Sequence, residues 1–288
     1  MNTTTQIRIA KSRCLHSGIV LFSVLTAVPL FAILGQVAVE GVQSLSLQFL
    51  TQPEPTSYQA LIATTQGEPM PGGIANGIIG TLLMLLMSSA AAIPLGMLCG
   101  VFLAENRDTP FAKVVSYITD VLQGTPSIII GIIVYAWVVV PMRSYSAIAG
   151  SVALAIMMMP LIIRSTEESL KMLPASLKEA SLALGGSYDR MVLRVLIPSA
   201  FGQIFTGVLL AVSRILGETA PITFTALGSA FIQWDVTQPM SNIPILIWQF
   251  YNNPSMQSML WSASLVLLLF VLTLNITSKL ISRKWKIQ

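Results

Sequence analysis

Six long apolar runs constrain this chain more than any other feature. Each run has about 20 mostly apolar residues, the length that an α-helix needs to cross a bilayer. The runs lie near residues 18–39, 74–103, 114–140, 148–163, 201–227 and 259–281. Only 10% of all residues are charged, far below the roughly 25% of a soluble domain. The sequence therefore predicts an all-α membrane protein with six transmembrane helices.

Two of these runs are irregular. The third contains Asp120, Gly124 and Pro126, so its first third is expected to bend or to lie near the interface. Gln123, Thr125 and Ser127 offer hydrogen bonds there, although simple helix initiation at residues 125–126 would explain the pattern equally well. The fourth run is short and is expected to end within residues 160–163.

The distribution of basic residues predicts the orientation, because Lys and Arg are retained on the cytoplasmic side. Arg143 alone is expected outside, and Arg214 lies within a span. The other 14 of the 16 basic residues fall in cytoplasmic segments if the N-terminus is inside: Arg8, Lys11, Arg13, Arg107, Lys113, Arg164, Lys171, Lys178, Arg190, Arg194, Lys279, Arg283, Lys284 and Lys286. Both termini are then cytoplasmic. The net charge of +4 reflects this topology and requires no nucleic-acid partner.

Two connecting segments differ in character. The external loop after the first run is rich in Pro, Gly and hydroxyl residues and is expected to be irregular. The cytoplasmic segment 164–198 is divided by Pro174 and by Gly185 and Gly186. Between these breakers apolar and small residues recur at helical spacing, which predicts a short amphipathic helix. Such a helix serves either to contact a partner or to lie on the membrane surface.

A sequence motif favours the partner. The run EASLALGGSYDRMVLRVLIP (179–198) resembles the EAA loop of permease subunits in ATP-binding-cassette importers, whose pattern is E-A-A, three residues, G, nine residues, I-x-L-P. Glu179, Ala180, Gly185 and Pro198 match, Ser181 replaces the second Ala, and Val195 and Ile197 replace Ile and Leu. The resemblance implies a type I importer permease fold, with a coupling helix that docks in a groove of the ATPase subunit. No Gly-Lys pair of a phosphate-cradling loop occurs, so the chain is expected to be no enzyme. It is expected to bind no cofactor, and ATP to be used by a separate subunit.

The fifth run carries two charges, Arg214 and Glu218, in AVSRILGETAPITF (211–224). A charge near mid-membrane is costly and normally faces a cavity or a partner. The two side chains share a helical face if the helix continues through Gly217, and could form a structural ion pair. Alternatively they line a substrate path, since Gly217 and Pro221 loosen the helix, Thr219 adds a hydroxyl, and a guanidinium suits a tetrahedral oxyanion.

The second resemblance concerns this same segment. SRILGETAPITFTALG (213–228) is similar to R-x-x-G-E-T-A-P-[LI]-x-F-T-A-L of the phosphate transport permeases, and the similarity extends to MPLIIRSTEESLKMLPASLKEASLALG upstream. It implies phosphate as the substrate and Arg214 as a residue of the translocation path, with Glu218 and Thr219 beside it. Arg164 is a weaker candidate, because an ordinary basic anchor at the cytoplasmic boundary explains it as well.

The expected protein is thus half of the pathway of an ATP-driven phosphate importer in a bacterial inner membrane. Its expected partners are a homologous permease subunit, a dimer of ATP-binding subunits, an external phosphate-binding protein and the lipid bilayer. The predicted organisation is a cytoplasmic segment (1–16), a first transmembrane helix with its external loop (17–73), a permease domain (74–281, coupling loop about 174–198) and a cytoplasmic tail (282–288). The alternatives are a permease for sulfate, molybdate or another small oxyanion, and a membrane channel or assembly protein without ATP coupling.

Overall fold

The computed structural model describes residues 3–285, and these residues form helices and loops without any strand. Five helices or helix runs are long and apolar enough to span a membrane, and a sixth span results if one bent pair is counted. The long helices are α1 (Thr3–Gln43), α4 (Ala75–Glu105), α8 (Ala147–Lys171), α11 (Ile197–Ile215) and α14 (Gln257–Trp285). The all-α membrane fold with six spans is therefore confirmed.

The shorter elements lie between the long ones. The bent pair comprises α5 (Pro110–Gly124) and α6 (Ser127–Val134), the latter continued by a π-helical turn and α7 (Val140–Met142). Its two halves meet at 107°, which confirms the bend expected near Gly124 and Pro126. The remaining short helices are α2 (Leu47–Thr51), α3 (Ser57–Gln66), α9 (Ala175–Ala183), α10 (Tyr188–Met191), α12 (Ala220–Thr225) and α13 (Ile243–Asn252).

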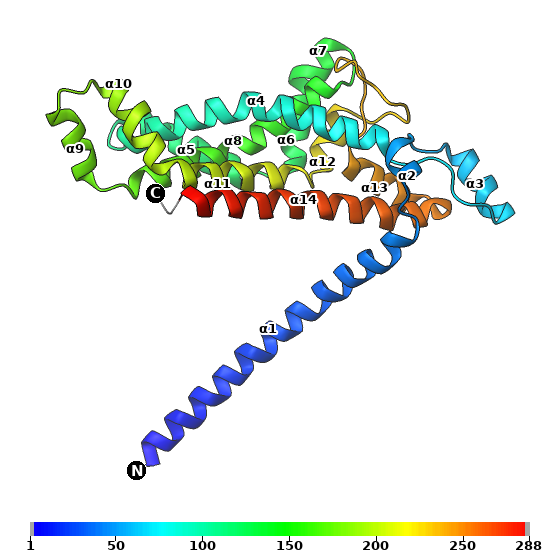
Figure 1. The fold of residues 1–288 in the computed structure, drawn as a ribbon, viewed down its shortest axis with the longest axis horizontal. Coiled ribbons are helices and arrows are strands. Elements are labelled where there is room, and N and C mark those ends of the chain that lie inside the picture. The colour runs from blue at the N-terminus through cyan, green and yellow to red at the C-terminus, as the bar shows by residue number, and fades with distance from the viewer. Residues whose placement is uncertain (1–2, 286–288) are drawn as a thin grey trace.

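Helices α4, α8, α11 and α14 run along the long axis of the body, with α8 packed between α4 and α11 (Figure 1). Gly100 permits the close contact of α4 with α8: a Cβ atom there would lie 2.7 Å from the Ile163 carbonyl oxygen and 2.6 Å from Cβ of Thr166. Small residues on membrane helices allow this kind of backbone approach.

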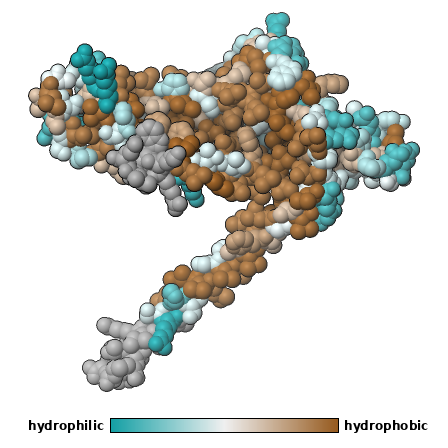
Figure 2. Space-filling model, viewed as in Figure 1, coloured by the Kyte–Doolittle hydropathy of each residue, from teal (hydrophilic) through white to brown (hydrophobic). Residues whose placement is uncertain are grey.

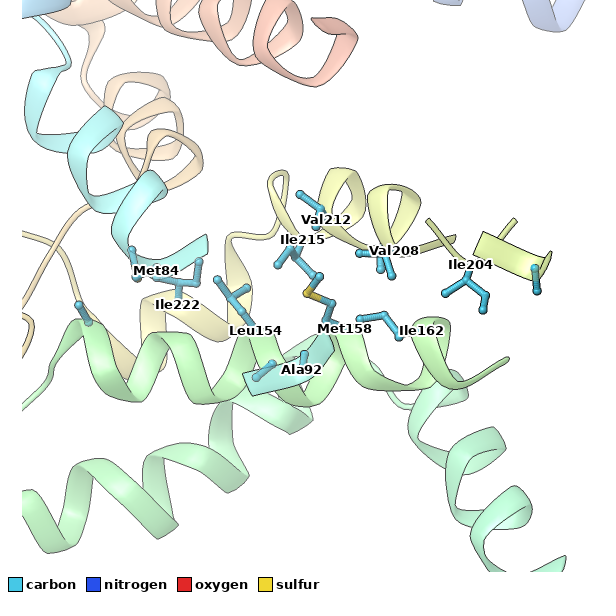
Figure 3. Close-up of a cluster of buried hydrophobic side chains, with 14 of the residues drawn as sticks. Met84, Ala92, Leu154, Met158, Ile162, Ile204, Val208, Val212, Ile215 and Ile222 are labelled. Carbon is cyan, nitrogen blue, oxygen red and sulfur yellow. The ribbon is translucent and has the colours of Figure 1, made fainter. Parts of the chain in front are cut away.

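A buried apolar cluster fills the space between these helices (Figure 3). Met84 and Ala92 of α4 meet Leu154 and Met158 of α8, and Ile222 of α12 lies beside them. The facing stripe of α11 consists of Ile204, Val208, Val212 and Ile215. Their spacing of three to four residues places one apolar side of α11 against α8. This packing fixes which face of α11 is turned to the core, and with it the side on which Arg214 lies.

Helix α1 leaves the body beside α2 and extends away from it (Figure 1). Its contact with the body is made with α14, where the Ser262 hydroxyl donates to the Gly41 carbonyl oxygen at 2.8 Å. Most of its surface is apolar and exposed (Figure 2). A helix that is apolar all round is suited to lipid or to another membrane subunit.

Two predicted span boundaries are wrong. Helix α8 does not end within residues 160–163 but continues through Pro160 to Lys171, since packed neighbours tolerate a proline inside a membrane helix. The fifth span begins earlier and ends earlier than predicted. Its continuous helix runs from Tyr188 to Ile215 and then breaks before α12, because Pro221 has no N–H to donate to the carbonyl four residues earlier, at Gly217, and its ring clashes with that carbonyl.

The connector between the first two long helices is also more regular than predicted. It contains α2 and α3, each with a side-chain cap at its start. The Ser46 hydroxyl accepts from the Phe49 N–H at 3.1 Å. Thr56 and Gln59 form a reciprocal capping box at α3. Such caps satisfy the free N–H groups of a first helical turn, and they stabilise short helices in a segment whose composition suggests a loop.

Candidate functional site

The first candidate site lies at the break between α11 and α12. Arg214 occupies the last turn of α11, on the exposed side of the helix. Among the residues that the structure describes, no hydrogen bond or ion pair reaches its guanidinium. The next residue of the same turn, Ile215, is buried against the core. The fold therefore leaves a charged side chain of a membrane helix without a partner in the described part of the chain.

Glu218 and Thr219 lie in the break itself. The condition for a shared helical face is not met, because α11 ends at Ile215 before it reaches Gly217. Within the described residues Glu218 forms no ion pair with Arg214. The Glu218 carbonyl oxygen accepts from Nδ2 of Asn242 at 3.4 Å, and the Thr219 carbonyl oxygen accepts from the Thr223 hydroxyl at 3.0 Å. The side chains of the break thus remain separate polar groups.

The second candidate site is a charged network around Arg164. Its Nη2 donates to Oδ1 of Asp120 at 2.6 Å and to Oγ of Ser116 at 2.7 Å, both on α5. Its Nη1 donates to Oε2 of Glu167 at 2.6 Å, and the other oxygen of Glu167 accepts from Lys171. Only 20% of the Arg164 side chain and 7% of the Glu167 side chain are exposed. The network joins α5 to α8 and occupies the guanidinium fork with protein groups.

A cavity of about 910 Å³ adjoins this network. It is lined by the ends of α4, α5 and α8 and carries four basic and four acidic side chains: Arg107, Lys113, Arg164, Lys171, Asp108, Asp120, Glu167 and Glu168. The charges balance, so the cavity has no strong preference for an anion. Within the described residues no group of three His, Cys, Asp or Glu side chains is placed to hold a metal ion.

The third candidate site is the segment around α9, at the same end of the body as this cavity (Figure 1). Lys178 forms an ion pair with Glu105 at the end of α4, and Leu177 packs against the core. The neighbouring residues Glu179 and Ala180 are exposed, as is Pro198 at the start of α11. Gly185 follows the helix with a φ of 78°, a left-handed conformation that favours glycine.

Large apolar side chains around α9 are uncovered. Leu184 is 89% exposed, and Leu182, Met172 and Tyr188 are also exposed. Because polar residues surround this end of the body (Figure 2), these side chains are candidates for contact with a protein partner. Helix α9 confirms that the breakers at Pro174 and Gly185 bound a short helix.

Sequence reasoning missed the partners of Arg164. Asp120 and Ser116 lie more than 40 positions earlier, so no local spacing pairs them with Arg164. The signal available was the sequence RSTEESLK, in which Arg164, Glu167 and Lys171 recur at helical spacing. The predicted end of the helix, before residue 164, placed these three residues outside it, so their spacing was not read as helical.

This arrangement of helices is the fold of an importer permease subunit. The chain matches the solved structure of the MetNI methionine ABC transporter in inward-facing conformations with a TM-score of 0.59, 22% identity, and coverage of 73% of this chain and 94% of that one. The chain belongs to the family of binding-protein-dependent transport system inner membrane components, whose model matches residues 92–287.

Two curated relatives are closely similar. The phosphate transport system permease protein PstA of Yersinia pestis is 38% identical over 257 residues, which cover 88% of this chain and 84% of that protein. The protein of the same name from Pasteurella multocida is 40% identical over 227 residues, covering 78% of this chain and 81% of that protein.

Proposed function

We propose that this chain is the permease subunit of an ATP-driven importer of inorganic phosphate and forms half of its translocation path. The observation that carries the proposal is the similarity to phosphate permeases over 88% of the chain, in a family of binding-protein-dependent permeases. The second half of the path is a homologous permease subunit. A phosphate-binding protein outside and a dimer of ATP-binding subunits inside complete the complex.

Arg214 is the residue that we assign to the path. Its guanidinium is exposed and unpaired within the described chain, and a charge on a membrane helix must face water or a partner subunit. If the path lies between this chain and a second permease, the Arg214 guanidinium is exposed on this chain and still faces water or a partner subunit in the complex. The planar fork then offers parallel charge-assisted hydrogen bonds to a phosphate oxyanion. Glu218 and Thr219 lie beside it, at the break in the helix.

Helix α9 is the coupling element in this proposal. Its exposed residues Glu179 and Ala180, and the uncovered Leu182 and Leu184, form the surface for the ATPase subunit. The ion pair of Lys178 with Glu105 connects α9 to the end of α4, so movement of the ATPase is transmitted to a spanning helix as a rigid-body displacement. ATP is bound and hydrolysed by the partner, and this chain binds no cofactor itself.

The orientation follows from the basic residues. The end of the body that carries α9 holds most of them, and the loops of the opposite end, residues 40–73 and 228–258, hold none. The end with α9 is therefore cytoplasmic, and an even number of spans places both termini there. The location is the bacterial inner membrane.

Uptake of radiolabelled phosphate at micromolar concentration tests this function. Cells that lack the chain are expected to lose phosphate uptake while sulfate uptake, measured alongside, stays unchanged. Loss of sulfate uptake alone would assign a different oxyanion to the same architecture. Retention of both uptakes, together with failure of the chain to copurify with an ATPase, would contradict the transport function.

A further inference from the structure

A pocket of about 500 Å³ lies at the end of the body opposite α9. It forms where the loop between α2 and α3 meets α13 and the turn that follows α13. Glu54 and Ser57 line one side of it, and Trp248, Gln249 and Asn252 line the other. These two sides are almost 200 residues apart in the sequence, so the pocket exists only because the external loops pack together.

The pocket presents several hydrogen-bond acceptors that have no partner among the described residues. Oε1 of Gln249 is buried and has no hydrogen-bond partner. Nδ2 of Asn252 donates to the Trp248 carbonyl oxygen at 2.7 Å, which leaves its Oδ1 available as an acceptor. Glu54 forms no ion pair among the described residues. Together with the half-exposed indole of Trp248, these groups suit a cation that carries several N–H donors.

Glu54 is the one charged residue that lines this pocket. Titratable groups of the surrounding elements lie outside the lining: Glu40 on α1, Tyr58 on α3, Glu68 after α3, Asp235 in the loop before α13, and Tyr251 on α13. Burial raises the pKa of Glu54 to about 7, because a carboxylate loses hydration there and gains no cation in return. Within the described residues the pocket thus holds a carboxyl group without a cation.

The missing cation must come from outside the membrane. The segment with α2 and α3 projects beyond the body (Figure 1) and is hydrophilic, in contrast to the apolar middle of the molecule (Figure 2). The external loops 40–73 and 228–258 contain no Lys or Arg, and Arg143, the one basic residue expected on this side, does not line the pocket. An acidic surface of this kind is complementary to a protein with a basic patch.

We propose that this pocket receives a Lys or Arg side chain of the external substrate-binding protein. The inference rests on the proposed function, since that function supplies a binding protein on this side. The ammonium or guanidinium group donates to the Glu54 carboxylate and to Oδ1 of Asn252, and its charge lies over the Trp248 ring. Docking of the binding protein thereby satisfies two polar groups that form no such bond among the described residues.

The proposal predicts that docking depends on pH. The cation requires the ionised form of Glu54, whose pKa in the free permease is about 7. The ionised fraction then falls from about 0.9 at pH 8 to about 0.1 at pH 6. Affinity for the binding protein is expected to weaken by up to about tenfold over this interval, and the weakening is lost when Glu54 is replaced by Gln.

The test uses the complete complex in nanodiscs made of phosphatidylglycerol, a lipid without an amine, with its own binding protein as the probe. Glu54→Gln is expected to weaken binding about tenfold at pH 8. Glu68→Gln is the matched control, because it removes the same charge from the same face outside the pocket, and it is expected to change affinity less than twofold. Glu54→Asp tests charge at the same position and is expected to retain most of the pH dependence.

Two results would overturn the inference. One is equal weakening by the Gln variants at positions 54 and 68, which would indicate general surface charge. The other is unchanged affinity of the Glu54 variant at pH 8. Phosphate uptake by vesicles that contain the same wild-type complex is scored separately. If phosphate is taken up but the Glu54 substitutions do not change the affinity for the binding protein, the pocket inference alone fails. If the affinity depends on Glu54 but phosphate is not taken up, the phosphate assignment alone fails.

Discussion

Two arginines in membrane helices illustrate how residue type alone leaves a role undecided. Arg164 donates to Asp120, Ser116 and Glu167. Its guanidinium is therefore occupied by protein groups and connects α5 to α8. Arg214 has no described partner and retains its donors for another molecule. An unpaired charge is costly in a membrane, and its presence on this helix is explained if a substrate or a hydrated channel solvates it.

At the residue scale, Arg214→Gln is expected to abolish phosphate uptake while the complex still assembles. The change removes the guanidinium but breaks no contact within the described chain, so thermal stability in detergent is expected to change by less than about 0.5 kcal/mol. Uptake of labelled phosphate and the yield of purified complex measure the two effects.

Arg13→Gln is the control for that substitution, because it makes the same chemical change at an exposed arginine of α1, outside the proposed path. It is expected to leave uptake unchanged. Normal uptake by the Arg214 variant would remove this residue from the path. Loss of assembly would instead show that Arg214 is a contact between subunits.

At the scale of elements, the sequence predicts helices well where breakers and apolar length agree. Pro174 and Gly185 bound α9, and Gly124 and Pro126 mark the bend of the third span. It predicts poorly where tertiary contacts override a local signal. Helix α8 passes through Pro160, and its continuation is held by an ion pair of Arg164 with Asp120 of α5 and by a hydrogen bond to Ser116. These partners are more than 40 residues from Arg164 in the sequence.

The network that joins α5 to α8 predicts unequal effects of two adjacent substitutions. Glu167 is buried between Arg164 and Lys171, whereas Glu168 is exposed. Glu167→Gln leaves both cations without their shared carboxylate and is expected to lower stability by about 2 kcal/mol. Glu168→Gln is expected to cost less than about 0.5 kcal/mol. Thermal unfolding of the two variants in detergent compares them, and equal melting temperatures would show that the network does not stabilise the fold.

The turn after α9 gives a second prediction at this scale. Gly185 has a φ of 78°, and a β-branched residue in that conformation costs about 1–2 kcal/mol. Gly185→Val is expected to reorient α9 and to reduce copurification of the ATPase subunit. Gly18→Val is the control, since Gly18 lies in helix α1 with open space around it. Unchanged association and transport in the Gly185 variant would exclude α9 as the coupling helix.

At the scale of the whole molecule, the charges and the apolar surface determine the arrangement in the membrane. The lengths of the apolar runs predict six spans, which agrees with the structure when the bent pair is counted as one span. The number of spans can therefore be predicted from the sequence alone. The separation of α1 from the body (Figure 1) could not be predicted, because an apolar helix has the same sequence signature whether it faces lipid, its own chain or another subunit. The proposed sites face the same limit, because Arg214 and Glu54 form no ion pair among the described residues and the proposed partners belong to other chains.

The proposed orientation predicts opposite accessibility of two exposed positions. In a chain whose Cys14 and Cys99 are replaced by Ala, Glu68→Cys places a thiol after α3, and Ser187→Cys places one between α9 and α10. If the basic end of the body is cytoplasmic, an impermeant maleimide labels the first position in intact cells and the second only after permeabilisation. Labelling of position 187 in intact cells would invert the topology. It would also place α9 where no ATPase subunit could reach it, so the coupling role and the orientation would fail together.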